Sequence, residues 1–174
     1  WHLASGLSIL EHAQVPSKDF LGALGSPWVA YSWLFEVLMA GVFRFSGFQG
    51  LQDAQFLLIF LSLSTLYIAF VKDHPLAGAH VLAALLVVFS VPLLAPFWHL
   101  RPQLLSVLLF TIVLFRVKAG RGPSLMLVPL TIVWANLHVF WIFSPMLAIL
   151  FASTFRKIIL SALLLLCGVL SPYF

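Results

Sequence analysis

The stretch VWANLHVFWIFSP, residues 133–145, places an asparagine and a histidine two residues apart in the middle of a long apolar segment. That segment runs from residue 124 to residue 155, which is too long for one membrane-spanning helix of about 20 residues. Its two halves have about 15 residues each, or roughly 22 Å of helix. We therefore predict a tight helical hairpin over residues 124–155, with a break at Asn136–Phe140.

The break accounts for the two polar side chains. Non-helical backbone is tolerated within a membrane only where protein or water surrounds it. We expect Asn136 and His138 to lie at the outer tip of the hairpin, bonded to backbone groups or to the N-terminal segment. Two roles stay open: the pair either caps the broken helix ends only, or also lines a binding pocket.

The composition indicates an integral membrane protein. Hydrophobic residues form 63% of the chain and charged residues 8%, and the mean hydropathy is +1.12. A soluble domain has roughly a quarter charged residues, so this chain has too little charge to cover a water-exposed surface. The basic residues behind the net charge of +4 lie between apolar runs. They therefore indicate membrane topology and not nucleic-acid binding.

The predicted fold class is all-α, because a backbone in lipid must form its hydrogen bonds internally. Residues 1–50 are the most polar part and are expected to form a loop and interfacial helices on the outer face. Residues 51–174 are expected to form a polytopic helical bundle. Its predicted spans are 52–71, 76–96, 103–117, the hairpin 124–155, and 158–171.

The distribution of lysine and arginine predicts the orientation of these spans. Basic residues are enriched on the cytoplasmic side of membrane proteins. With the N-terminal segment outside, six of the nine basic residues lie inside and three lie outside. The six are Lys72, Arg116, Lys118, Arg121, Arg156 and Lys157, and the three are Lys18, Arg44 and Arg101.

Polar side chains from three segments are then expected to meet on the outer face. A guanidinium there can bind phosphate through forked, charge-assisted hydrogen bonds, and a carboxylate can accept the proton of a sugar hydroxyl. The polar side chains are Glu11, His12, Lys18, Asp19 and Glu36 of the N-terminal segment, His99, Arg101 and Gln103 of WHLRPQ, and Asn136 and His138.

Each candidate also has a structural alternative. Arg101 can extend to lipid headgroups, His99 can lie at the interface, and Asp19 can be a solvated turn residue. Glu36 and Arg44 can face each other on an interfacial helix. The six histidines show no spacing typical of metal ligands, and the single cysteine lies in an apolar run, so neither a metal nor a cofactor is predicted.

Five segments, taken in order, resemble a known family. They are WHLASGLSILEHAQVPSKD (1–19), GSPWVAYSWLFEVL (25–38), LRPQLLSVLLF (100–110), WANLH (134–138) and LSPYF (170–174). The pattern is similar to bacterial polytopic membrane proteins related to the dolichyl-phosphate-mannose–protein mannosyltransferases of the GT-C superfamily.

The resemblance implies a GT-C-like fold in the bacterial cytoplasmic membrane and sugar transfer from a polyprenyl-phosphate donor at the outer face. The partners it implies are membrane lipids and that lipid-linked sugar. The site expected on this basis is Asp19 as the catalytic residue, Arg101, His99, His138 and Asn136 at the donor phosphate, and Glu11 and Glu36 as further candidates.

The chain also departs from that family. Where the family often has a His-Glu pair, this chain has Tyr31-Ser32, and where glycines tend to follow NLH it has Val139-Phe140. These changes favour an alternative: a degenerate member that retains the scaffold and serves as a structural subunit among other membrane subunits. Because the chain begins at Trp1 and ends directly after an apolar run, we also expect it to be part of a longer protein.

Overall fold

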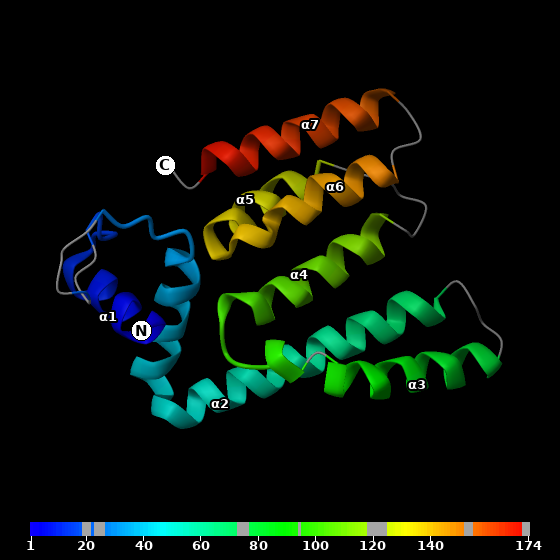
Figure 1. Ribbon diagram of the computed structural model, residues 1–174, viewed down its shortest axis with the longest axis horizontal. Helices are drawn as coiled ribbons and strands as arrows, with labels where there is room; N and C mark the ends of the chain where they lie inside the picture. The colour runs from blue at the N-terminus through cyan, green and yellow to red at the C-terminus, as the bar shows by residue number, and fades with distance from the viewer. Residues whose placement is uncertain are drawn as a thin grey trace.

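The computed structural model describes residues 1–18, 22, 27–72, 77–93, 95–117, 125–151 and 155–171. Within these ranges the chain is all-helical, as predicted, and the only extended pairing is an isolated bridge between Lys18 and Pro27. The helices in chain order (Figure 1) are α1 His2–His12, α2 Trp33–Val71, α3 Ala77–Leu93, η1 Ala95–Phe97, α4 Pro102–Arg116, α5 Leu127–Leu137, η3 Val139–Ile142, α6 Phe143–Leu150 and α7 Phe155–Leu170.

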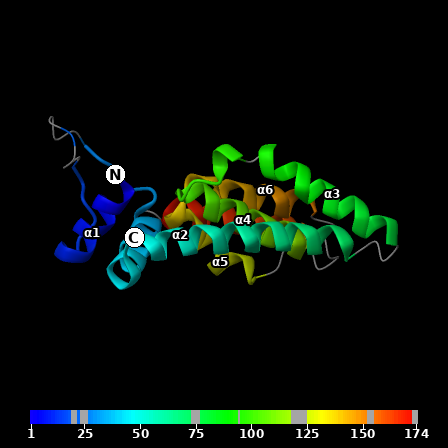
Figure 2. The same ribbon diagram turned by 90° about the horizontal axis from the view of Figure 1, so that it is seen from below.

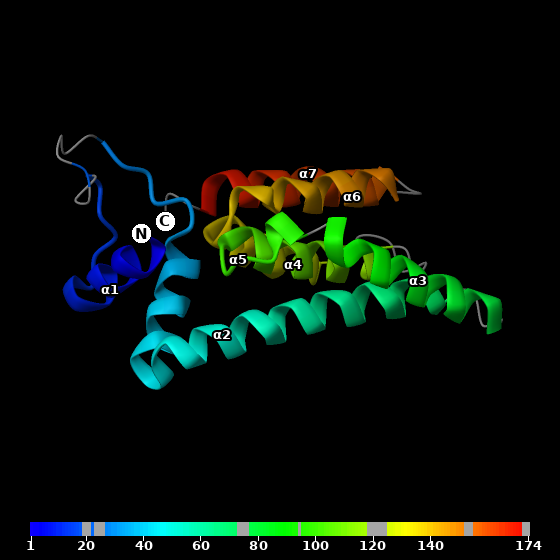
Figure 3. The same ribbon diagram turned by 60° about the horizontal axis from the view of Figure 1, so that its bottom comes forward.

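From the middle of α2 onward the helices reverse direction repeatedly and lie side by side (Figures 1 and 3). At one end of this bundle, the Lys72 ammonium after α2 lies 4.6 Å from the ring centre of Phe115 in α4. Nearby, Arg116 donates a hydrogen bond to the sulfur of Met126, which precedes α5. At the opposite end α1 lies beside the first turns of α2 (Figure 2).

The break predicted within residues 124–155 is present. Helix α5 ends at Leu137, His138 is extended with φ −169° and ψ 149°, and η3 and α6 follow. The hydroxyls of Thr131 in α5 and Ser144 in α6 are hydrogen-bonded at 2.7 Å, which ties the two arms together. The polar pair of the opening stretch therefore marks the point where the chain turns back.

Helix α2 begins much earlier than the predicted span 52–71 and bends at Gly47. The φ of 62° and ψ of −153° at Gly47 are non-helical and belong to a region open essentially to glycine alone. The chain therefore stays helical across the predicted boundary at residue 50, and its direction changes three residues earlier, at Gly47. Gln49 donates to Asp53 at 2.9 Å, a pairing across one turn that stabilises a helix.

Among the described residues, α2 alone is long enough and apolar enough to cross a membrane by length and composition. The remaining apolar helices have 10–17 residues. At 1.5 Å per residue, 15 residues span about 22 Å, less than the roughly 30 Å of a bilayer core. The buried core forms between α2, α4, α5, α6 and α7, and Trp134 is its largest fully buried side chain.

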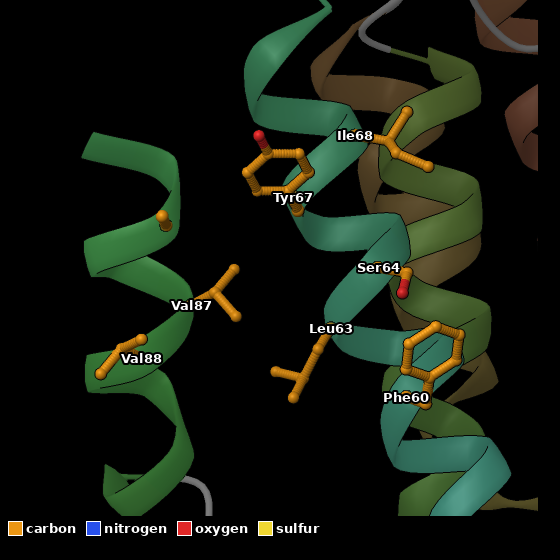
Figure 4. Close-up of a pocket in the computed structure, with 8 residues that line it drawn as sticks. Phe60, Leu63, Ser64, Tyr67, Ile68, Val87 and Val88 are labelled. Carbon is orange, nitrogen blue, oxygen red and sulfur yellow. The ribbon is translucent and has the colours of Figure 1, made fainter. Parts of the chain in front are cut away.

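Helix α3 packs on α2 and is otherwise exposed. Ala83 is the one buried hydrophobic residue that α3 contributes among the described side chains. An apolar groove of about 550 Å³ lies between the two helices, and the hydroxyl of Tyr67 reaches the Nδ1 of His80 across it at 3.0 Å. The residues that line it (Figure 4) are Phe60, Leu63, Ser64, Tyr67, Ile68, Ala84, Val87 and Val88.

Substitution of Gly47 tests whether α2 bends at this residue. A Cβ at Gly47 meets nothing within 4 Å, so Gly47→Ala is penalised by its backbone conformation alone. We expect it to lower the free energy of unfolding by about 1–3 kcal/mol, measured by denaturant titration in detergent. Gly41→Ala is the matched control, because Gly41 also has open space around it but helical geometry. It should stabilise by about 0.5–1 kcal/mol, and equal effects of the two variants would contradict the bend.

Candidate functional site

Helix α1 approaches the first part of α2 closely because Gly6 has no side chain. A Cβ at Gly6 would lie 2.0 Å from the carbonyl oxygen of Glu36 and 2.9 Å from the Cβ of Ala40. Ser5 and Ile9 are buried on the same face of α1. This contact brings the start of α1 against the first turn of α2.

The contact pairs His2 with Glu36. The Glu36 side chain is buried, with 1% exposed. Its Oε1 accepts a hydrogen bond from the hydroxyl of Ser32 at 3.1 Å and lies 3.0 Å from the Nδ1 of His2. Its Oε2 has no hydrogen-bond partner among the described residues. A buried carboxylate is costly unless it is paired and hydrogen-bonded, so His2 and Ser32 are what hold Glu36 in place.

The imidazole of His2 is itself fixed by aromatic neighbours. It stacks on Trp1, with ring centres 4.4 Å apart, and meets Phe35 edge-on at 5.9 Å. The Trp1 ring in turn contacts Trp28 edge-on at 4.8 Å. The histidine therefore has a defined orientation, set by rings on both sides and by the carboxylate of Glu36.

A polar cavity of about 520 Å³ opens beside His2. Arg101 precedes α4 and has an exposed side chain, with no ion pair or hydrogen bond to any described residue. The Oε1 of Gln103 is buried, also without a hydrogen-bond partner among those residues. The lining residues are Trp1, His2, Leu3, Tyr31, Leu100, Arg101 and Gln103.

Asn136 connects three helices. Its Oδ1 accepts a hydrogen bond from the indole nitrogen of Trp33 at 2.8 Å, and its Nδ2 donates to the carbonyl of Ile132 at 2.9 Å and to the hydroxyl of Ser171. The Ser171 hydroxyl donates to the same Ile132 carbonyl at 3.2 Å. The amide thus joins the start of α2, the end of α5 and the end of α7.

His138 belongs to a second, buried network. The hydroxyl of Ser106 accepts from the indole of Trp134 at 2.9 Å and lies 3.1 Å from the Nδ1 of His138. The backbone N–H of Phe140 also donates to that Nδ1, at 3.3 Å. Since Nδ1 accepts, the proton of a neutral His138 ring is on Nε2. Burial, with a smaller contribution from nearby His2, lowers the pKa of His138 from 6.5 to about 4, so the ring is neutral at pH 7.

The structure places some of the residues predicted from the sequence at the cavity and others away from it. Arg101 lies in the cavity, Glu36 lies behind it, and Asn136 and His138 form the networks that were expected of them, with backbone and N-terminal partners. His99 is exposed and outside the cavity lining, although its carbonyl accepts from the Arg101 amide at 2.7 Å. Asp19 lies outside the described residues.

Two expectations for acidic residues need correction. Glu11 does not join the cavity, because it forms an exposed ion pair with Arg44 at 3.6 Å. For the same reason Glu36 and Arg44 do not face each other: the Gly6 contact turns Glu36 toward His2 instead. Both errors come from the packing of α1, which the sequence pattern did not specify.

Sequence reasoning did not identify His2, Tyr31, Trp33, Ser106 and Ser171 as functional candidates. Ser106 is the one of these that the sequence could have indicated, because a polar residue in the apolar helix α4 must find a hydrogen-bond partner. The described residues also contain no group of three His, Cys, Asp or Glu side chains placed to hold a metal ion. Comparisons with family models, curated proteins and solved structures find no match to this chain.

The contact between Trp33 and Asn136 can be measured by a double-mutant cycle. Trp33→Phe and Asn136→Ala each remove the hydrogen bond between the indole and the amide. We expect a coupling free energy of about 0.5–1.5 kcal/mol in unfolding titrations in detergent. A cycle between Trp33→Phe and Ser62→Ala is the control, because Ser62 bonds the Leu58 carbonyl within α2. Additive effects at Trp33 and Asn136 would show that this hydrogen bond does not join α2 to α5.

The buried histidine predicts acid sensitivity. The pKa of His138 is about 4 in the folded protein and near 6.5 when the ring is solvated, so the unfolded state binds the proton first as the pH falls. Folding stability should therefore decrease from about pH 6.5 down to about pH 4 and level off below. His138→Asn keeps an acceptor near the Nδ1 position and should lose less stability over this interval, measured by unfolding titrations at each pH. An identical pH dependence in the variant would contradict the assignment.

Proposed function

We propose that this chain is a multi-pass membrane protein with a GT-C-like fold in the bacterial cytoplasmic membrane. We propose further that the cavity at Arg101 binds the phosphate of a polyprenyl-phosphate-linked sugar at the outer face. The observation that carries the proposal is Arg101 itself. It is a guanidinium that pairs with no described residue, and it shares a polar cavity at the end of an apolar helical bundle with the Gln103 oxygen, which also has no hydrogen-bond partner among the described residues.

The multi-pass arrangement is supported by the placement of charge. Lys72 follows α2, Arg116 ends α4 and Lys157 is in the first turn of α7, and Figure 1 shows these helix ends at the same end of the bundle. Arg156 is also in the first turn of α7, whereas Lys18, Arg44 and Arg101 belong to the other end, with α1, so four described basic residues stand against three. This separation is typical of a protein whose more basic end faces the cytoplasm. The short helices suit a bilayer that is thinned locally.

The chemistry of the cavity supports a lipid-linked sugar phosphate as the class of ligand. A guanidinium matches a phosphate through forked hydrogen bonds, and the amide of Gln103 and the hydroxyl of Tyr31 add groups that can bond sugar hydroxyls. The apolar exposed surfaces of α2 and α3 suit a hydrocarbon chain attached to such a phosphate. A lipid-linked sugar phosphate combines these three features in one ligand.

A non-catalytic structural subunit is the second candidate, and one observation favours it. Most of the large apolar side chains of α3 are exposed, and an apolar groove lies between α3 and α2 (Figure 4). Such a surface is typical of a helix that packs against a helix of another subunit. This candidate requires no ligand at Arg101. Lipid-phosphate binding therefore discriminates between the two candidates.

Binding of a short-chain polyprenyl phosphate to the protein in nanodiscs of zwitterionic lipid tests the proposal. Arg101→Gln should weaken binding about 10- to 150-fold, because a hydrogen bond to a charged group contributes about 1.5–3 kcal/mol. Arg44→Gln is the matched control and should bind like the unmodified protein, since Arg44 pairs with Glu11 away from the cavity. Equal binding by both variants, or no binding by the unmodified protein, would contradict donor binding and favour the structural subunit.

A further inference from the structure

We propose that His2 is the general base of a glycosyl transfer in the Arg101 cavity, with Glu36 as the residue that positions it. The proposal rests on the proposed function, because it takes the donor phosphate to bind at Arg101. It adds the residue that would receive the proton of the acceptor hydroxyl.

The geometry of the His2 ring supports this role. Its Nδ1 is 3.0 Å from the buried Oε1 of Glu36, and an ionised carboxylate only accepts hydrogen bonds. Nδ1 therefore donates, and the lone pair of the neutral ring is on Nε2. Nε2 forms no hydrogen bond with the described residues, and the side chain, 21% exposed, lines the cavity. A carboxylate behind a histidine fixes its tautomer and stabilises the imidazolium that forms when the free nitrogen takes a proton.

The other titratable groups around the cavity suit this role less well. Glu36 is buried and does not line the cavity. His138 uses its Nδ1 as an acceptor from Phe140 and holds its proton on Nε2, so toward a ligand it is a donor. Tyr31 and Arg101 offer the cavity an O–H and N–H groups, which suit hydrogen-bond donation. Among the described residues, His2 is the cavity-lining group that has a ring nitrogen without a hydrogen-bond partner.

The step can be written with its atoms balanced. The oxygen of an acceptor hydroxyl forms a bond to C1 of the donor sugar while the bond from C1 to the phosphate oxygen breaks. The electron pair of the broken bond stays on the phosphate, whose added charge lies beside Arg101. The hydroxyl proton moves to Nε2 of His2, and Glu36 stabilises the resulting imidazolium. Polyprenyl phosphate leaves, and the proton is released to water.

Donor turnover and donor binding, measured on the same variants, test the proposal. The probes are polyprenyl-phosphate mannose, labelled in the sugar, for turnover, and polyprenyl phosphate for binding, with a membrane extract as the source of acceptor. His2→Gln should reduce kcat about 10²- to 10⁴-fold and leave the binding of polyprenyl phosphate within about twofold. Added imidazole should partly restore kcat to His2→Ala. Glu36→Gln should lower kcat less than His2→Gln and respond weakly to imidazole, because the ring is still present.

His12→Gln is the matched control on the same helix. His12 is exposed, and its Nδ1 bonds to the carbonyl of Ser8 away from the cavity, so kcat should not change. A kcat retained in His2→Gln, or no rescue of His2→Ala by imidazole, would contradict the assignment of His2 as the general base. If the unmodified protein binds polyprenyl phosphate but releases no sugar, the base proposal fails while donor binding stands. If it does not bind polyprenyl phosphate, the proposed function fails.

Discussion

The structure depends on one constraint: in the membrane location proposed for this apolar chain, every break in a helix must find hydrogen-bond partners inside the protein. An unpaired backbone group in lipid costs several kcal/mol. The break after α5 meets the constraint with two side chains, Asn136 and His138, whose bonds reach α2, α4 and α7. Satisfying the break therefore also gathers four helices at one end of the bundle, and the cavity at Arg101 lies at that end.

Much of this fold could be predicted from the sequence because its causes are local. Length and polarity are properties of contiguous residues, so the positions of α3, α4 and α7 and the break at His138 follow from apolar runs and their interruptions. The bend at Gly47 could not be predicted, since glycine occurs in many straight helices. The partners of Glu36 and Glu11 could not be predicted either. They depend on how α1 lies against α2, which is decided by a close approach at Gly6 between residues distant in sequence.

In the candidate site, too, some residues could be predicted from the sequence and others could not. Arg101 and Glu36 are conspicuous because charge is rare in this chain, and that rarity is visible without a structure. His2 is one of six histidines and has no local feature that separates it from the others. The role proposed for it depends on a carboxylate 34 residues away, on two aromatic rings, and on a cavity whose other wall belongs to the segment before α4. The ligand class proposed here comes from the GT-C resemblance, and a guanidinium that pairs with no described residue supplies a physical reason for it.

A distance measurement between Arg101 and a bound phosphate tests the central claim most directly. The protein would carry ¹⁵N-labelled arginine in a phosphate-free amphipol, so that added polyprenyl phosphate is the only source of ³¹P. In solid-state NMR we expect ³¹P–¹⁵N dipolar dephasing of one guanidinium at hydrogen-bonding distance from the phosphate. This dephasing should disappear in Arg101→Gln but not in Arg44→Gln. Dephasing that survives Arg101→Gln, or that is absent from the unmodified protein with the lipid bound, would contradict the central claim.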